Sequence, residues 1–172
     1  MDVGRRSSRS FRFLFLLFVE GIHTLYQKED GQCNDDEVQR GLDKITVIYE
    51  FVVSNLTYDK QKAKNVQSGY LPNVDKVLAE KKGICFDYAA LMTAMLRSQG
   101  IPTKLVVGYT GDVYHAWINT FIPEKGWIEG IIFFDGTTWK LMDPTFASSA
   151  NQSKQIMEYI GNGSNYSAKY VY

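Results

Sequence analysis

The segment from Cys85 to Gln99 constrains the fold of this chain more than any other. Its side chains are apolar nearly all round a helical wheel, which is typical of a helix that is buried on several sides. Gly100 and Pro102 follow directly, and together they end a helix, because glycine adopts the left-handed conformation and proline cannot continue the hydrogen bonding. The sequence therefore predicts a central buried helix around which the rest of the domain packs.

Two further helices are predicted before the central one. Apolar side chains recur at helical spacing over residues 38–56, so that one wide face of this helix can lie against a core. Asn34 and Glu37, three residues apart, form the capping-box pattern at its start. A shorter helix is predicted after Asn73, which can cap it, and it is expected to end at Gly83.

Strand patterns follow the central helix. Segments 103–109 and 114–122 have the composition of strands, and the second alternates between two faces. Two more strands are predicted at 126–134 and 137–143, joined by the tight turn Asp135-Gly136. Helices followed by neighbouring strands predict an α+β fold with an antiparallel sheet.

Composition and charge exclude several classes of function. The 172 residues are 45% apolar and 14% aromatic, which is typical of one globular domain. Lys plus Arg and Asp plus Glu number 19 each, whereas a nucleic-acid-binding protein carries a basic excess. Two cysteines and two histidines, with no CxxC or HxxxH spacing, argue against a zinc site. We therefore expect neither a metal nor a nucleic-acid partner.

The amino-terminal residues differ from the rest of the chain. Residues 1–33 contain three arginines among the first nine positions and then an apolar run at 13–19, a pattern that resembles a secretory signal. We therefore expect a leader at 1–33, a single domain at 34–172, and a location outside the cell or in its envelope. Because Arg12 interrupts the pattern and no small-x-small cleavage site follows, the alternative is a cytoplasmic protein whose first segment packs on the core.

The position of Cys85 at the amino end of a helix has a chemical consequence. Unpaired backbone N–H groups and the helix dipole stabilise negative charge there, which favours the thiolate. The same N–H groups can stabilise an oxyanion that forms beside the sulfur. Gly83, two residues earlier, is expected to leave room for a substrate backbone. The alternatives are a buried small residue and a disulfide between Cys85 and Cys33.

A thiolate nucleophile needs a base and a group that orients the base. Of the two histidines, His23 lies in the leader-like segment, whereas His115 lies in the second predicted strand. Asp143 ends the last predicted strand, and adjacent antiparallel strands can present His115 and Asp143 side by side. Asp135 is the rival acid, but its place is in a turn. A hydrogen-bonded sheet histidine and an aspartate that caps a turn before Pro144 are the structural alternatives.

Three sequence blocks carry a family resemblance. "GICFDYAALMTAMLRSQGIPTKLVVGY", "HAW" and "WKLMDPT" resemble the core motifs of the transglutaminase-like superfamily, in the order of that family. The resemblance implies a papain-like fold in which the cysteine-bearing helix packs on an antiparallel sheet. It also implies that Cys85 is the nucleophile, His115 the general base and acid, and Asp143 the orienting carboxylate. Tyr58 is the candidate for a second oxyanion donor, which some members take from an aromatic side chain upstream of the cysteine.

Together, the Cys85, His115 and Asp143 motifs predict a thiol enzyme that acts on amide bonds of a peptide or protein substrate through an acyl-thioester. Hydrolysis, as in a cysteine protease, is the first expectation, and transfer to an amine, which cross-links protein glutamine, is the alternative. No metal or organic cofactor is required for either reaction. A non-catalytic module that binds peptides or cell wall, and an acyltransferase that uses a thioester donor, are the remaining hypotheses.

Overall fold

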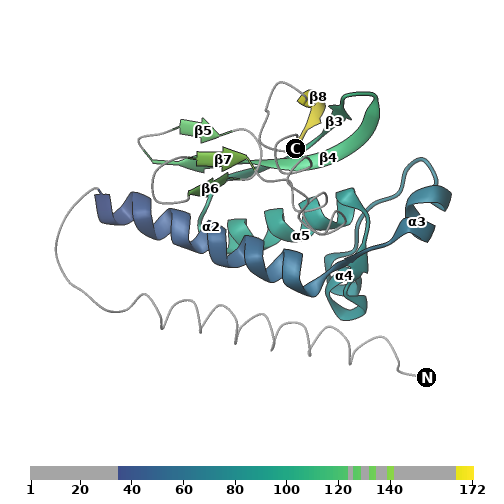
Figure 1. Ribbon diagram of the computed structural model, residues 1–172, viewed down its shortest axis with the longest axis horizontal. Helices are drawn as coiled ribbons and strands as arrows, with labels where there is room; N and C mark the ends of the chain where they lie inside the picture. Colours follow the sequence, from purple (N-terminus) through teal and green to yellow (C-terminus); the bar gives the residue numbers. More distant parts are fainter. Residues whose placement is uncertain (1–34, 124–125, 129–131, 135–138, 142–165) are drawn as a thin grey trace.

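The computed structural model describes residues 35–123, 126–128, 132–134, 139–141 and 166–172. Within them the helices form one layer, and the two antiparallel sheets lie over it (Figure 1). The helices are α2 (Asp35–Asn55), α3 (Lys60–Asn65), α4 (Val74–Glu80) and α5 (Cys85–Ser98). The strands are β1 (Thr57–Tyr58), β2 (Lys82–Gly83), β3 (Thr103–Thr110), β4 (Val113–Ile122), β5 (Gly126–Ile128), β6 (Ile132–Phe134), β7 (Trp139–Leu141) and β8 (Tyr166–Val171).

The predicted helices are all present, but one boundary differs, and the predicted capping residue Asn34 lies outside the described residues. Asn73 caps α4, because its side-chain oxygen accepts a hydrogen bond from the backbone N–H of Lys76 at 3.0 Å. Gly100 follows α5 with a φ of +76°, as the helix-stop pattern requires. However, α4 ends before Gly83: Lys81 adopts the left-handed conformation with a φ of 52°. Gly83 itself lies in β2.

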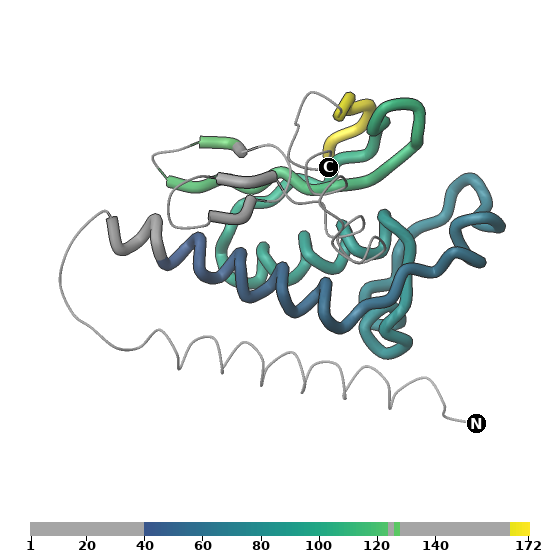
Figure 2. Tube along the Cα trace, in the orientation of Figure 1, coloured from purple at the N-terminus to yellow at the C-terminus, as the bar shows by residue number. Residues whose placement is uncertain are grey.

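The main sheet has four antiparallel strands in the order β5-β4-β3-β8. The α+β prediction is therefore confirmed, but two details differ. The segment 126–134, predicted as one strand, holds β5 and β6, and β6 pairs with β7 in a separate two-stranded sheet. Strand β8, which the sequence did not suggest, lies against β3 (Figure 2). The predicted Asp135-Gly136 turn lies outside the described residues.

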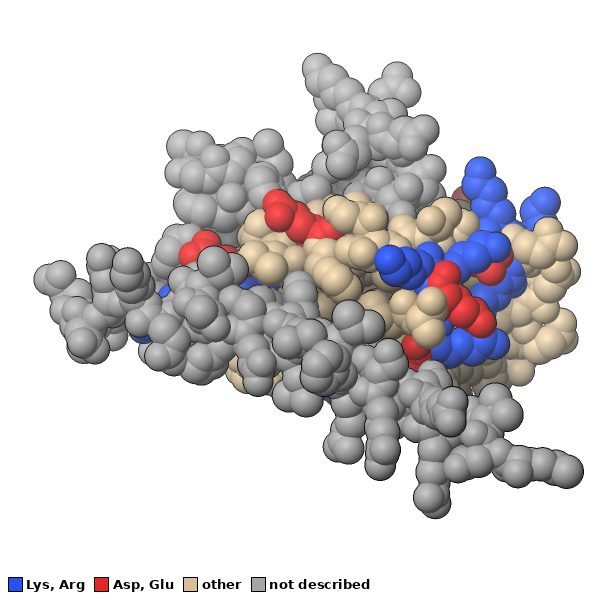
Figure 3. Space-filling view, turned by 90° about the horizontal axis from the view of Figure 1, so that it is seen from below, with Lys and Arg blue, Asp and Glu red and all other residues tan. Residues whose placement is uncertain are grey.

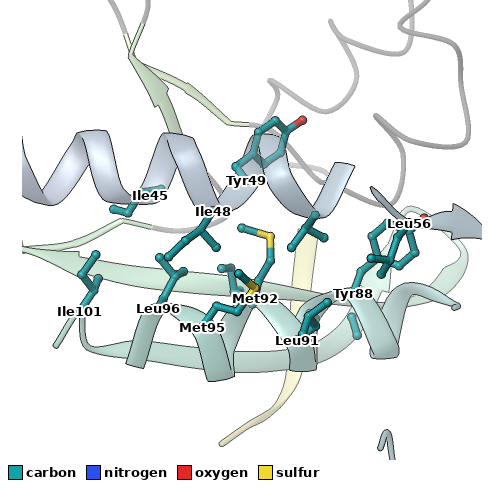
Figure 4. Close-up of a cluster of buried hydrophobic side chains, with 14 of the residues drawn as sticks. Ile45, Ile48, Tyr49, Leu56, Tyr88, Leu91, Met92, Met95, Leu96 and Ile101 are labelled. Carbon is teal, nitrogen blue, oxygen red and sulfur yellow. The ribbon is translucent and has the colours of Figure 1, made fainter. Parts of the chain in front are cut away.

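The core lies between α2, α5 and the sheet. Figure 4 shows side chains of α2 and α5 meeting between the two helices, and these are almost completely buried: Ile45, Ile48, Leu91, Met92, Met95 and Leu96. From the sheet side, Ala116 and Ile118 of β4 join the same cluster. Complete burial of one such large side chain contributes about 1.5–3 kcal/mol, so α5 is held on two sides. None of the helices that the structure describes has both the length and the apolar character to cross a membrane.

Candidate active site

Cys85 is the first residue of α5, and its thiol is free and partly exposed. The residue before it, Ile84, has an extended backbone and begins the helix: its carbonyl oxygen accepts the N–H groups of Asp87 and Tyr88 at 2.9 and 3.1 Å. The N–H of Ile84 donates to a carboxylate oxygen of Asp87 at 2.8 Å. Because the first N–H groups of a helix have no acceptor within it, the N–H of Cys85, the first residue of α5, has no acceptor in the helix.

His115 is the third residue of β4 and is 4% exposed. Its ring stacks near that of Trp117, with centroids 6.4 Å apart and planes at 19°. Trp117 in turn meets Tyr166 of β8 edge to face at 5.1 Å, whereas Ala116, between the two, belongs to the core cluster. The predicted alternation of β4 is thus confirmed, and His115 and Trp117 share one face of the strand.

The chain path brings Cys85 and His115 to the same end of the domain. Helix α5 rises about 20 Å from its first to its last residue, and β3 then runs back along it. His115 pairs with Gly108, which lies about 17 Å along β3 from its start. The first turn of α5 and the start of β4 therefore lie at about the same height along the helix axis, and the helix packs against this strand. In Figure 1 the β3–β4 turn and the α4–α5 junction lie toward the same end.

The described residues do not include Asp143, nor the rival Asp135, His23 and Cys33. The assignment of Asp143 stays a prediction. The strand that precedes it, β7, pairs with β6, while β4 pairs with β3 and β5. The sequence led us to expect β7 and β4 to be hydrogen-bonded neighbours, but in the structure these two strands are not paired with each other.

Tyr58 lies near the start of α5 because of a short parallel pairing. Its Cα is paired with that of Gly83, two residues before Cys85. The flanking hydrogen bonds join Thr57 N–H to Lys81 carbonyl at 3.0 Å and Asp59 N–H to Gly83 carbonyl at 2.8 Å. The side chain of Tyr58 is partly buried and packs against the core. Its role as an oxyanion donor stays a prediction.

A charge cluster, which the sequence did not reveal, surrounds Asp87 in the first turn of α5, two residues after Cys85. Asp87 is 0% exposed; one of its carboxylate oxygens accepts from Lys62 Nζ at 2.6 Å and the other from the Tyr70 hydroxyl at 2.5 Å. Lys62 Nζ also donates to the Tyr70 oxygen at 2.6 Å. We call Lys62, Tyr70 and Asp87 the Asp87 cluster. A carboxylate in the first turn of an otherwise apolar helix is the sequence signal that points to it.

The contacts of the Asp87 cluster shift two pKa values. Burial lowers the pKa of Lys62, but the hydrogen bonds from its ammonium to Asp87 and Tyr70 outweigh burial and raise it above the ordinary 10.5. Burial, and then the hydrogen bond to Asp87, raise the pKa of Tyr70 above the ordinary 10.0. The folded protein therefore favours an ammonium and a neutral phenol at this site.

The expectation that Gly83 leaves room for a substrate is wrong. A Cβ at this position would lie 2.6 Å from Asp87 Cβ and 3.1 Å from Asp87 Oδ2. Gly83 is itself buried. The absent side chain therefore makes space for Asp87, which folds back to the backbone of Ile84.

Comparison with known proteins decides the family. The family model of the transglutaminase-like superfamily matches residues 24–130, a range that includes Cys85 and His115. The chain belongs to the transglutaminase-like superfamily. This transglutaminase-like chain is 30% identical to YebA, an uncharacterized protein of Bacillus subtilis, over 50% of the chain and 14% of YebA. It is 28% identical to a protein-glutamine gamma-glutamyltransferase of Pseudomonas aeruginosa, over 49% of the chain and 13% of that relative.

A solved structure supports the fold of this transglutaminase-like domain. The crystal structure of a TGase superposes with a TM-score of 0.53 at 17% identity, covering 90% of this chain and 36% of that one. At this level of identity the likeness concerns the fold alone. The chain spans about a seventh of the length of the two curated relatives and about a third of the TGase chain.

Proposed function

We propose that this protein is a thiol enzyme that attacks amide bonds of peptides or proteins. Cys85 is the nucleophile, His115 is the general base and acid, and Asp143 orients the imidazole. The observation that carries the proposal is the free, partly exposed thiol at the amino end of a buried helix, with the buried His115 at the same end of the domain.

The reaction follows from these positions. His115 takes the proton of the Cys85 thiol, and the sulfur adds to the amide carbon, so that the carbonyl oxygen becomes an oxyanion. The N–H of Cys85 is the first candidate donor to that oxygen, and Tyr58 is the second. The carbon–nitrogen bond then breaks, the amine leaves with the proton from His115, and a thioester remains on Cys85. Water, activated by His115, releases the acid and restores the thiol.

Transfer to an amine is the second candidate. It shares the thioester and differs only in the final acceptor, and the name of the Pseudomonas aeruginosa relative favours it. Since this chain covers only 13% of that relative, the acceptor has to be measured rather than carried over.

Mass spectrometry of a peptide mixture separates these reactions. Wild type and Cys85→Ala are incubated with glutamine-containing peptides and a primary amine, with the exposed Ser98→Ala as the matched control. New termini or deamidated glutamine indicate hydrolysis, and amine adducts on glutamine indicate transfer; both products should require Cys85 and persist in the control. No product from wild type across varied peptides would refute the proposal and favour a non-catalytic peptide- or wall-binding module. The location outside the cell or in its envelope stays a prediction, which fractionation of cells that make the full chain tests.

A further inference from the structure

Asp87 is fully buried, and its carboxylate takes hydrogen bonds from three parts of the chain. Lys62 belongs to α3, Tyr70 lies between α3 and α4, and the backbone N–H of Ile84 begins α5. Because these three donors bind the two carboxylate oxygens of Asp87 from different directions, they hold the side chain in one orientation. The cluster therefore ties the surface segment between β1 and β2 to the first turn of the central helix.

A second chain of hydrogen bonds holds Lys62 in place. The backbone N–H of Lys62 donates to Asp59 Oδ1 at 2.9 Å, and Asp59 caps α3. Asp59 N–H donates to the Gly83 carbonyl at 2.8 Å. The lysine that binds Asp87 is thus anchored, through one residue, to the strand that leads into α5.

These two sets of bonds enclose Cys85. Gly83 lies two residues before it and is held by β1, while Asp87 lies two residues after it and is held by Lys62 and Tyr70. Between them the Ile84–Asp87 hydrogen bond fixes the turn on which Cys85 stands. The Lys62 side of this ion pair is 28% exposed, and the desolvation of both charges offsets part of their attraction. The hydrogen bonds of Asp87 also restrict the backbone conformation of the first turn of α5, and Cys85 is part of that turn.

We propose that the Asp87 cluster positions Cys85, so that the sulfur and the N–H of Cys85 keep the orientation that the reaction requires. Asp87 acts on the helix turn directly, and Lys62 and Tyr70 act through Asp87. All three lie outside the proposed triad of Cys85, His115 and Asp143, so they are positioning residues. The proposal rests on the proposed function in one respect, that Cys85 is the nucleophile.

A cavity of about 530 Å³ opens beside the cluster and gives the test its matched control. Lys62, Tyr70 and Lys76 are among the residues that line it. The Lys76 ammonium forms an exposed pair with Glu80 at 3.7 Å, and its side chain is 70% exposed, whereas that of Lys62 is 28% exposed. Figure 3 shows charges of both signs at this end of the molecule. Lys62→Met and Lys76→Met therefore remove the same charge from one cavity, and only the first breaks the cluster.

The test compares Tyr70→Phe, Lys62→Met and Lys62→Arg with Lys76→Met and wild type, at a temperature where all are folded. Two rates are measured: alkylation of Cys85 by iodoacetamide, and turnover of the best peptide substrate. Tyr70→Phe and Lys62→Met should lower the alkylation rate and kcat together, by about tenfold, with KM within twofold, because small displacements of reacting groups cost rate rather than binding. Lys62→Arg should recover part of the loss, and Lys76→Met should match wild type.

The outcomes separate this proposal from the proposed function. Variants that melt earlier but alkylate and turn over like wild type would show a purely structural cluster and overturn the inference. A rise in KM alone would also overturn it, since it would make Lys62 and Tyr70 substrate contacts. If wild type has no amide activity but the variants still alkylate more slowly, the proposed reaction fails while the positioning role stands.

Discussion

Replacing Gly83 by alanine tests directly whether Asp87 fills the space beside it. The added Cβ would lie 2.6 Å from Asp87 Cβ, about 1 Å closer than the ~3.5–4.0 Å at which two carbons are in contact. Neither side can move freely, because Gly83 is paired with Tyr58 and Asp87 is held by Lys62. The strain therefore falls on the first turn of α5.

The expected loss follows from two costs. Overpacking a tight site costs about 1–3 kcal/mol, and loosening a hydrogen bond to a buried carboxylate costs about 1.5–3 kcal/mol. We expect the free energy of unfolding of Gly83→Ala to fall by about 3 kcal/mol. For a domain of this size that lowers Tm by about 6–12 °C. Alkylation of Cys85 should slow as well, because the turn that carries it is displaced.

Thermal and urea unfolding, followed by circular dichroism, measure the effect. Gly41→Ala is the matched control: Gly41 lies inside α2, and a Cβ there meets nothing within 4 Å. That variant should gain about 0.5–1 kcal/mol, since glycine is unfavourable inside a helix. If Gly83→Ala instead unfolds and alkylates like wild type, Asp87 does not occupy the space beside Gly83, which refutes the prediction.

Three further predictions concern other parts of the domain. Gly108→Ala should lose about 4 kcal/mol, because its Cβ would lie 2.0 Å from the Ser167 carbonyl oxygen; limited proteolysis should then cut the chain near β8 first. Leu91→Ala, at a completely buried position, should lose about 3–5 kcal/mol in urea unfolding. The raised pKa values of Lys62 and Tyr70 stabilise the fold fully below about pH 10. That contribution is lost as pH rises through the folded values, because the unfolded chain releases these protons first, and melting from pH 9 to 11.5 should show a shallower decline in Lys62→Met than in wild type.

The features that the sequence predicted are those that local signals determine. The apolar wheel of 85–98 and its Gly100 stop define α5, and the alternation at 114–122 defines β4, including the face that His115 shares with Trp117. Cys85 at the start of a helix follows from the same boundary. Each of these depends on residues within a few positions of one another.

The features that the sequence did not reveal depend on distant partners. Lys60–Asn65 has no apolar face, and α3 is held instead by its Asp59 cap and by the Lys62–Asp87 contact. The partners of Asp87 lie 25 and 17 residues away, and no pattern in the chain pairs them. The role of Gly83 cannot be predicted from the sequence for the same reason, since the Asp87 cluster determines which side chain lies beside it.

The position of β8 has a consequence for the order in which the domain assembles. β3 and β4 are joined by a two-residue turn, so this hairpin can form within microseconds. β8 reaches β3 only after more than 50 further residues, and closing so long a loop makes its pairing late. Until then the backbone N–H and C=O groups on the β8-facing edge of β3, at Val106 and Val107, are unpaired. An extended segment of another chain can pair with them. The last strand to arrive is therefore also the one that protects the nascent sheet from aggregation.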